Sequence, residues 1–190
     1  MNKLHAGCGD HYVKGWINLD IRDDIKTDVK TLHPFSYPFQ DDYLDAIYIA
    51  HVIEHLEPFD VLLLLEELKR ISKPGAPVLI TGPDIKRLLV RWMEEPRDPI
   101  DEMYPLLILE GGEDVWPDLP NRNRDHHRWN THAERVHEMA LSIFPEAEII
   151  QPYTGAFPPQ EPEEWFDPVN QMTWPTQNHS YWDFGIMCYA

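Results

Sequence analysis

Residues 4–21 constrain the fold more than any other part of the chain. A short apolar run ends in Gly7-Cys8-Gly9, and a second run, which begins at Trp16, ends in Asp20. Short apolar runs that end in turn residues are typical of buried strands. Glycine lacks a Cβ and tolerates positive φ, so it lets the backbone approach a ligand closely. The segment therefore predicts two short strands whose tips form part of a ligand site.

The acid at the second tip favours one kind of ligand. A carboxylate at the end of a strand can accept hydrogen bonds from two ribose hydroxyls. An ordinary turn at the glycines and a solvated or capping Asp20 are the structural alternatives. Cys8 has no cationic neighbour that would favour a thiolate, so we expect it to pack. The glycine turn at residues 7–9 and the carboxylate of Asp20 together predict half of a nucleotide-binding site.

The rest of the first half alternates strand-like and helix-like segments, which is typical of an α/β fold with a mostly parallel sheet. In this half, strands are expected over residues 3–7, 16–20, 25–29, 44–50 and 77–81, and helices over 58–72 and 85–94. The second half adds an expected helix over 133–143 and two expected strands over 147–152 and 184–189. Only residues 10–15 separate the first two strands, whereas a parallel crossover normally takes about a dozen residues. The first crossover is therefore shortened and cannot hold a full helix.

Four segments in this order carry a resemblance to a known family. They are LHAGCGDHYVKGWINLDI at residues 4–21, YLDAIYIAHVIEHL at 43–56, LLLEELKRISKPGAPVLITGPD at 63–84 and DHHRW at 125–129. The chain resembles the class I S-adenosylmethionine-dependent methyltransferases, most closely a small subgroup that opens L-x-x-G-C-G and continues G-W-I-N-L-D. The resemblance implies one Rossmann-like, doubly wound domain over residues 1–190, with a mostly parallel sheet, an antiparallel C-terminal strand and S-adenosyl-L-methionine as cofactor.

The resemblance also implies roles for individual residues. The methionine part of the cofactor would lie over Ala6, Gly7, Cys8 and Gly9. Asp20 would hold the ribose hydroxyls and Ile21 would face the adenine, whose amino group and ring nitrogen would contact Asp28 and Val29. The transferring methyl would be bordered by Ala50 and His51. Asp28 is equally well explained as a loop acid. A neutral imidazole is a competent general base near pH 7, so His51 is the first catalytic candidate. It could instead shape the pocket while its carbonyl holds the cofactor's amino group.

The chain has two histidine groups. His51-Val-Ile-Glu54-His55 matches the H-x-x-E-H pattern of zinc peptidases, which requires both histidines on one helix face. A predicted strand runs directly into this motif and Pro58 follows it, so we expect no metal site here. The second group is Asp125-His126-His127-Arg128-Trp129, in which His126 and His127 are further catalytic candidates. Metal binding or a solvated loop are the alternatives for this second group, because imidazole and carboxylate suit a metal.

Two long irregular segments, residues 96–130 and 154–183, are expected to cover the site, since loops of this length in a compact domain are usually functional. The late aromatic residues would either stack on a planar or sugar substrate or plug the core; they are Trp165, Trp174, Tyr181 and Trp182.

Composition excludes several classes of partner. The formal net charge is −17 over 190 residues, and no Lys or Arg follows Arg135. Such a field repels nucleic-acid backbones and anionic membranes. The chain lacks both an apolar run of the ~20 residues that would span a bilayer and a leader sequence, so a cytoplasmic protein is expected. Two cysteines form no disulfide framework, which fits a reducing compartment.

These observations predict a methyltransferase that acts on a small molecule or a sugar by direct in-line transfer. Two alternatives remain: a catalytically inactive module that keeps the nucleoside site, and a metal-dependent hydrolase built on the histidines. The acceptor and the oligomeric state stay open.

Overall fold

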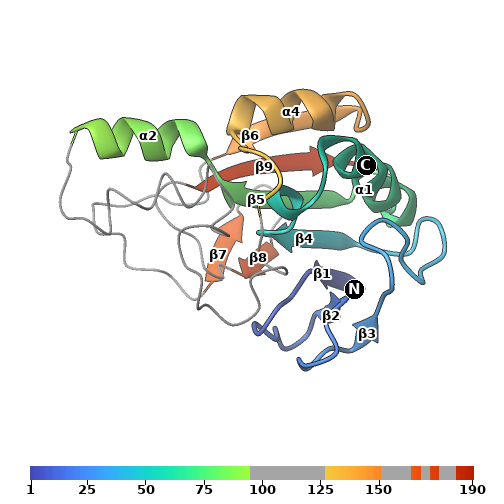
Figure 1. Ribbon diagram of the computed structural model, residues 1–190. Helices are drawn as coiled ribbons and strands as arrows, with labels where there is room; N and C mark the ends of the chain where they lie inside the picture. Colours follow the sequence, from blue (N-terminus) through green and yellow to red (C-terminus); the bar gives the residue numbers. More distant parts are fainter. Residues whose placement is uncertain (95–126, 151–163, 168–171, 176–182) are drawn as a thin grey trace.

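The computed structural model describes residues 1–94, 127–150, 164–167, 172–175 and 183–190. Its centre is a seven-stranded sheet with the strand order β3-β2-β1-β4-β5-β9-β6, which can be followed in Figure 1. The strands are β1 (Lys3–Ala6), β2 (Ile17–Asp20), β3 (Val29–Lys30), β4 (Ala46–Ala50), β5 (Pro77–Pro83), β6 (Glu146–Ile150) and β9 (Asp183–Tyr189). The first five are parallel, and β9 runs antiparallel to β5 and β6. This arrangement confirms the predicted doubly wound sheet with an antiparallel C-terminal strand.

The described residues hold three α-helices, which lie close to the predicted positions, and one 3-10 turn, which was not predicted. They are η1 (Ile53–His55), α1 (Pro58–Ile71), α2 (Ile85–Glu94) and α4 (Ala133–Leu141). α1 begins with proline in its first turn and ends with Lys69 and Arg70 in its last turn. Proline lacks the N–H that the first turn cannot pair, and cations near the C-terminus interact favourably with the helix dipole. These are local signals, so the sequence locates this helix to within a residue.

Alternate residues of the strands serve two different cores. Ile47 and Ile49 of β4 face the larger core, which they share with α1 and α4. Ala46, Tyr48 and Ala50 of the same strand face a smaller core on the other side of the sheet. Successive side chains of a strand point to opposite faces, so β4 is buried throughout because both faces are covered.

The short first crossover is confirmed, and aromatic side chains cover part of the sheet beside it. No helix lies between β1 and β2. Instead, Trp16 packs edge-on against Tyr48 with ring centroids 6.4 Å apart, and His5 stacks on the same tyrosine at 5.1 Å. Lys3 Nζ lies 4.8 Å from the centre of the Trp16 ring. Large flat rings bury much apolar area from few residues, which suits a crossover this short.

Two parts of the structure differ from the sequence prediction. β3 is shorter and begins later than predicted, at Val29. β7 (Glu164–Asp167) and β8 (Met172–Pro175) pair as an antiparallel hairpin inside the segment predicted to be irregular. Most of the other irregular segment, residues 95–126, lies outside the described residues. Within the described residues, no helix is long and apolar enough to cross a membrane.

Candidate functional site

The tips of β1, β2 and β4 meet at one edge of the sheet. These strands are neighbours and parallel, so their carboxyl ends, Ala6, Asp20 and Ala50, point the same way. In open α/β sheets, ligands bind at this edge, where the strand order reverses on either side of β1.

The glycine turn after β1 is held in a conformation that glycine adopts readily. Gly7 and Gly9 have φ values of 66° and 52°. The backbone N–H groups of Gly7 and Cys8 both donate to the carbonyl oxygen of Leu19, at 2.8 and 3.1 Å. A Cβ on Gly7 would lie 2.2 Å from Cγ2 of Val52. Gly7 therefore lets the segment after β4 approach the turn closely, as well as supplying the positive φ.

Asp20 ties the glycine turn to the end of β2. Its side chain is nearly buried, with the residue only 6% exposed. Oδ2 accepts the N–H of Gly9 at 2.8 Å, and Oδ1 accepts the N–H of Arg22 at 2.9 Å. A carboxylate oxygen accepts more than one hydrogen bond, so both oxygens keep capacity for hydroxyl donors. The backbone thus fixes the orientation of this carboxylate.

Ile21 and Cys8, which the resemblance also places at the cofactor, differ in their exposure to solvent. Ile21 is 56% exposed at this edge, so its side chain offers an apolar surface to a flat ring. Cys8 is buried, and burial together with the charge of Asp20 raises the pKa of its thiol to about 12. The thiol therefore packs and does not act as a nucleophile.

Asp28 lies at the amino end of β3, because the strand begins at Val29 rather than ending there. Its carboxylate accepts the backbone N–H of Asn18 at 2.9 Å, the Asn18 side-chain amide at 3.0 Å and the Tyr12 hydroxyl at 2.7 Å. The backbone hydrogen bond from Asn18 is the main reason that the pKa of Asp28 is lowered. These contacts fasten the short crossover to β2. They also occupy the Asp28 carboxylate, which was predicted to contact the adenine.

His51 follows β4 and bridges two buried acids. Its backbone has a φ of 52°, which is uncommon for a residue other than glycine. Nδ1 lies 3.1 Å from Oε1 of Glu54, and Nε2 lies 3.1 Å from Oδ2 of Asp183. Burial lowers the pKa of His51, but the hydrogen bonds to Asp183 and Glu54 outweigh it and raise the pKa to about 10. Both ring nitrogens therefore point at carboxylates within the protein.

The second histidine motif lies against the first. The N–H of Arg128 donates to the Glu54 carbonyl oxygen at 2.7 Å, and the Trp129 indole N–H donates to that of Ile53 at 2.9 Å. The rings of His55 and His127 meet edge to face, with centroids 4.9 Å apart. No pattern in the sequence predicts this contact between the two motifs. His126 lies outside the described residues.

Two functional candidates were missed in the sequence, Glu54 as a buried acid and Asp183. Glu54 had one usable signal, since a residue three positions after His51 can turn back toward it. Asp183 had none, because its partner is 132 positions away in the chain.

Comparisons with known proteins show which proteins the chain resembles. The fold resembles a methyltransferase from Archaeoglobus fulgidus described as dependent on S-adenosylmethionine, with 17% identity over 100% of this chain and 86% of that one, at a TM-score of 0.55. A possible histamine N-methyltransferase from Thermotoga maritima matches with 12% identity, 99% and 81% coverage and a TM-score of 0.57. A putative Haloferax volcanii methyltransferase, solved in complex with the Trm112 activator, matches with 16% identity, 100% and 82% coverage and a TM-score of 0.55. No curated protein matches the chain.

A family model described as a methyltransferase domain matches residues 16–80. The fold of the whole chain and the sequence of residues 16–80 therefore resemble the class I S-adenosylmethionine-dependent methyltransferases. The matched residues begin just before β2 and end within β5, so they include Asp20 and His51, and the resemblance expected from the sequence is confirmed. This resemblance implies S-adenosyl-L-methionine as the cofactor.

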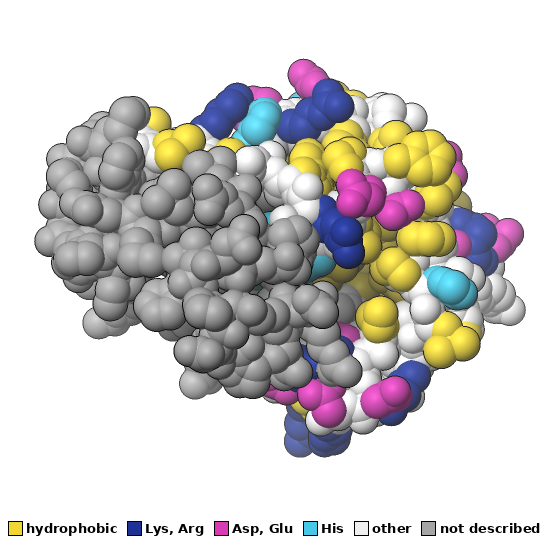
Figure 2. All heavy atoms as spheres, in the orientation of Figure 1, with side chains coloured by type: hydrophobic (Ala, Val, Ile, Leu, Met, Phe, Trp, Pro, Cys, Tyr) yellow, Lys and Arg dark blue, Asp and Glu magenta, His cyan; other side chains and the backbone are white. Residues whose placement is uncertain are grey.

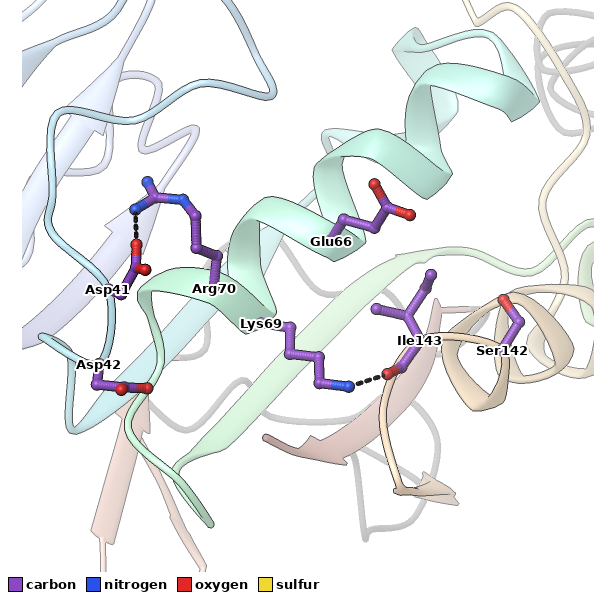
Figure 3. Close-up of a pocket in the computed structure, with 7 residues that line it drawn as sticks. All are labelled: Asp41, Asp42, Glu66, Lys69, Arg70, Ser142 and Ile143. Atoms are coloured by element: carbon purple, nitrogen blue, oxygen red, sulfur yellow. Dashed lines mark hydrogen bonds and ion pairs between the residues drawn. The ribbon is translucent and has the colours of Figure 1, made fainter.

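The protein has a separate surface groove of about 570 Å³ near the opposite, amino edge of the sheet. Figure 3 shows its lining, in which Lys69 donates to the Ile143 carbonyl oxygen and Arg70 pairs with Asp41, both at 2.6 Å. These cations already have partners, so the groove does not resemble an anion site. On the face in Figure 2, acidic, basic and apolar side chains of the described residues are interspersed.

Proposed function

We propose that this domain transfers the methyl group of S-adenosylmethionine directly to a small molecule or a sugar. The observation that carries the proposal is the 2.8 Å hydrogen bond from the Gly9 N–H to Asp20 Oδ2, because it joins the two halves of a nucleoside site at the ligand-binding edge of the sheet. The net charge of −17 argues against a nucleic-acid acceptor.

The transfer would be an in-line displacement at the sulfonium methyl. Holding two reactants close and aligned can contribute up to ~7–11 kcal/mol to such a step, so no covalent enzyme intermediate is needed. The raised pKa of the buried Cys8 thiol supports this, since no thiolate stands ready at the turn. The protein's part is to orient cofactor and acceptor and to exclude water.

In this proposal, different residues at the strand tips bind different parts of the cofactor. Ala6 to Gly9 support the methionine part, Asp20 holds the ribose hydroxyls, and Ile21 lies against the adenine. We put the adenine nearer to Ile21 than to Asp28 and Val29, because the Asp28 carboxylate already binds Asn18 and Tyr12. Ala50 and His51 border the methyl group.

His51 is better suited to positioning than to proton removal. A general base must reach the proton that it removes, and here both ring nitrogens contact Glu54 and Asp183. We therefore propose that His51 shapes the site after β4, and that His127, which reaches the same region, is the histidine nearer to the acceptor. Neither assignment involves His126.

Calorimetric titration with S-adenosylmethionine and S-adenosylhomocysteine tests the cofactor site. Asp20→Ala should weaken binding tenfold or more, about 1.4 kcal/mol. Asp24→Ala is the matched control, since its carboxylate pairs with Arg22 on the surface and should change the affinity less than twofold. A tenfold effect of Asp28→Ala would move the adenine to Asp28. Failure of the unaltered protein to bind either ligand would overturn the proposal.

The short first crossover favours one competing function, a module that binds the cofactor without catalysis. A crossover helix would have pointed its N-terminus at the cofactor, and no helix lies between β1 and β2. Measuring the formation of S-adenosylhomocysteine in the presence of alcohol, amine and sugar acceptors distinguishes an active methyltransferase from such a module. Saturable cofactor binding with no turnover on any acceptor would favour the module.

A further inference from the structure

We propose that Glu54, His55 and His127 bind a divalent transition-metal ion beside the tip of β4. Each residue offers one ligand atom, a carboxylate oxygen or an imidazole nitrogen, and these atoms all lie within 4.8 Å of one another. Glu54 is buried and the two histidines are half-buried. The cluster therefore has one side in the protein and one side that solvent or a ligand can reach.

The carboxylate of Glu54 supplies the second observation. Its Oε1 lies 3.1 Å from Nδ1 of His51. Its Oε2 is buried and has no hydrogen-bond partner among the described residues. Buried polar atoms in native proteins nearly always have a partner, so an exception calls for an explanation. A metal ion held with His55 and His127 would satisfy this oxygen.

The backbone holds the third ligand in place. The hydrogen bonds from Arg128 N–H to Glu54 and from the Trp129 indole to Ile53, at 2.7 and 2.9 Å, fasten the segment after His127 to η1. His55 and His127 already meet edge to face. Metal–nitrogen and metal–oxygen bonds of about 2.1 Å require the ligand atoms to converge further, which rotation of two half-buried rings can supply.

The donor set selects the class of metal. Two imidazoles and one carboxylate suit Zn²⁺, Mn²⁺ or Fe²⁺, whereas Mg²⁺ and Ca²⁺ prefer oxygen ligands alone. Three protein ligands leave coordination positions open, as in catalytic rather than structural sites. These positions can take water or an oxygen atom of a bound molecule.

This site departs from the expectation that the H-x-x-E-H motif binds no metal. The structure agrees with the reason for that expectation, because His51 and His55 do not act together: His51 contacts Asp183 instead. The third ligand comes from the second histidine motif. Only the approach of the two motifs in space assembles the set.

The location suggests what the open positions would hold. Val52, within the same segment as Glu54, packs on Gly7 of the cofactor turn. If the proposed function holds, the ion lies beside the transferring methyl, and an acceptor with a hydroxyl or other oxygen donor would bind through it. This last step rests on the proposed function, whereas the metal site itself does not.

Zinc titration of the chelator-treated protein, followed by calorimetry, tests the site. The unaltered protein should bind one Zn²⁺, and His55→Ala and His127→Ala should each weaken binding tenfold or more. His33→Ala is the control, because this exposed histidine follows β3, which lies three strands away from β4 in the sheet, and its loss should change the affinity less than twofold. Glu54→Gln should also lose binding; if circular dichroism shows that it does not fold, the two histidine variants decide. No binding, or an equal effect of all three histidine variants, would overturn the proposal.

A parallel titration with S-adenosylhomocysteine keeps the two proposals apart. The chelator-treated protein that binds this ligand but no zinc would disprove the metal site and leave the cofactor site standing. Zinc binding that His55→Ala and His127→Ala abolish, in a protein that does not bind S-adenosylhomocysteine, would support the metal site and overturn the cofactor proposal.

Discussion

Nε2 of His51 lies 3.1 Å from Oδ2 of Asp183, so a single side chain joins the residue after β4 to the first residue of β9. The other ring nitrogen contacts Glu54, and both acids are buried. This bridge crosses the end of β5, which lies between β4 and β9 in the sheet. It fixes the edge at which the cofactor is expected.

Removal of His51 should destabilise the fold, because two buried carboxylates lose the hydrogen bonds that its imidazole makes to both of them. Loss of one partner of a buried ion pair costs about 3–5 kcal/mol, and we expect the lower end for His51→Ala because the ring is partly exposed. Urea unfolding measures the change. Adding Asp183→Asn to His51→Ala should recover part of the loss; strictly additive effects would show that the bridge does not couple them.

Gly7→Ala should be more harmful than Gly9→Ala. Both changes introduce a Cβ at positive φ, which costs about 1 kcal/mol. Only at Gly7 does the new atom meet a neighbour, at 2.2 Å from Val52 Cγ2, whereas nothing lies within 4 Å at Gly9. Overpacking of this kind costs a further ~1–3 kcal/mol. In urea unfolding, Val52→Ala should rescue part of the Gly7→Ala defect; no rescue would contradict the steric explanation.

His5 should make the fold less stable in mild acid. Burial lowers its pKa from 6.5 to about 4. The native state therefore disfavours the proton that the unfolded chain takes up below pH 6.5, so stability is full above that pH and falls as the pH drops toward 4. Between pH 7 and 5 the loss from this group is about 2 kcal/mol.

Urea unfolding at both pH values, repeated on His5→Phe, checks this prediction. Phenylalanine keeps the stacking on Tyr48 and cannot titrate. Its stability should change less between pH 7 and 5 than that of the unaltered protein. An equal change in the two proteins would assign the pH dependence to other groups.

Both cysteines should be unreactive in the folded protein. Cys8 and Cys188 are free and buried, and burial raises the pKa of each thiol to about 12. Since only the thiolate reacts, a colorimetric disulfide reagent should modify them slowly at pH 8 and rapidly in urea. Rapid modification of one thiol in the native protein would show that its site opens.

The sequence alone located much of the fold. The order of strands and helices, the start of α1 at Pro58 and the turn at Gly7 all follow from local signals: the spacing of apolar residues, proline in a first turn and glycine after a strand. Asp20 belongs with them, since it ends a strand that its own neighbours define. The hairpin of β7 and β8 escaped prediction because its strands are only four residues long and lie in a segment rich in proline and tryptophan that shows little periodicity.

Tertiary structure decided which side chains share the site. Asp28 lies at the start of β3 because contacts with Asn18 and Tyr12 outweigh a weak local pattern. The approach of Asp183 to His51, and of His127 to Glu54, depends on strand order and on hydrogen bonds between distant segments. Local patterns determine which elements form, because their energetics involve near neighbours. The chemistry of this edge depends on packing between distant residues, which only the folded chain brings together.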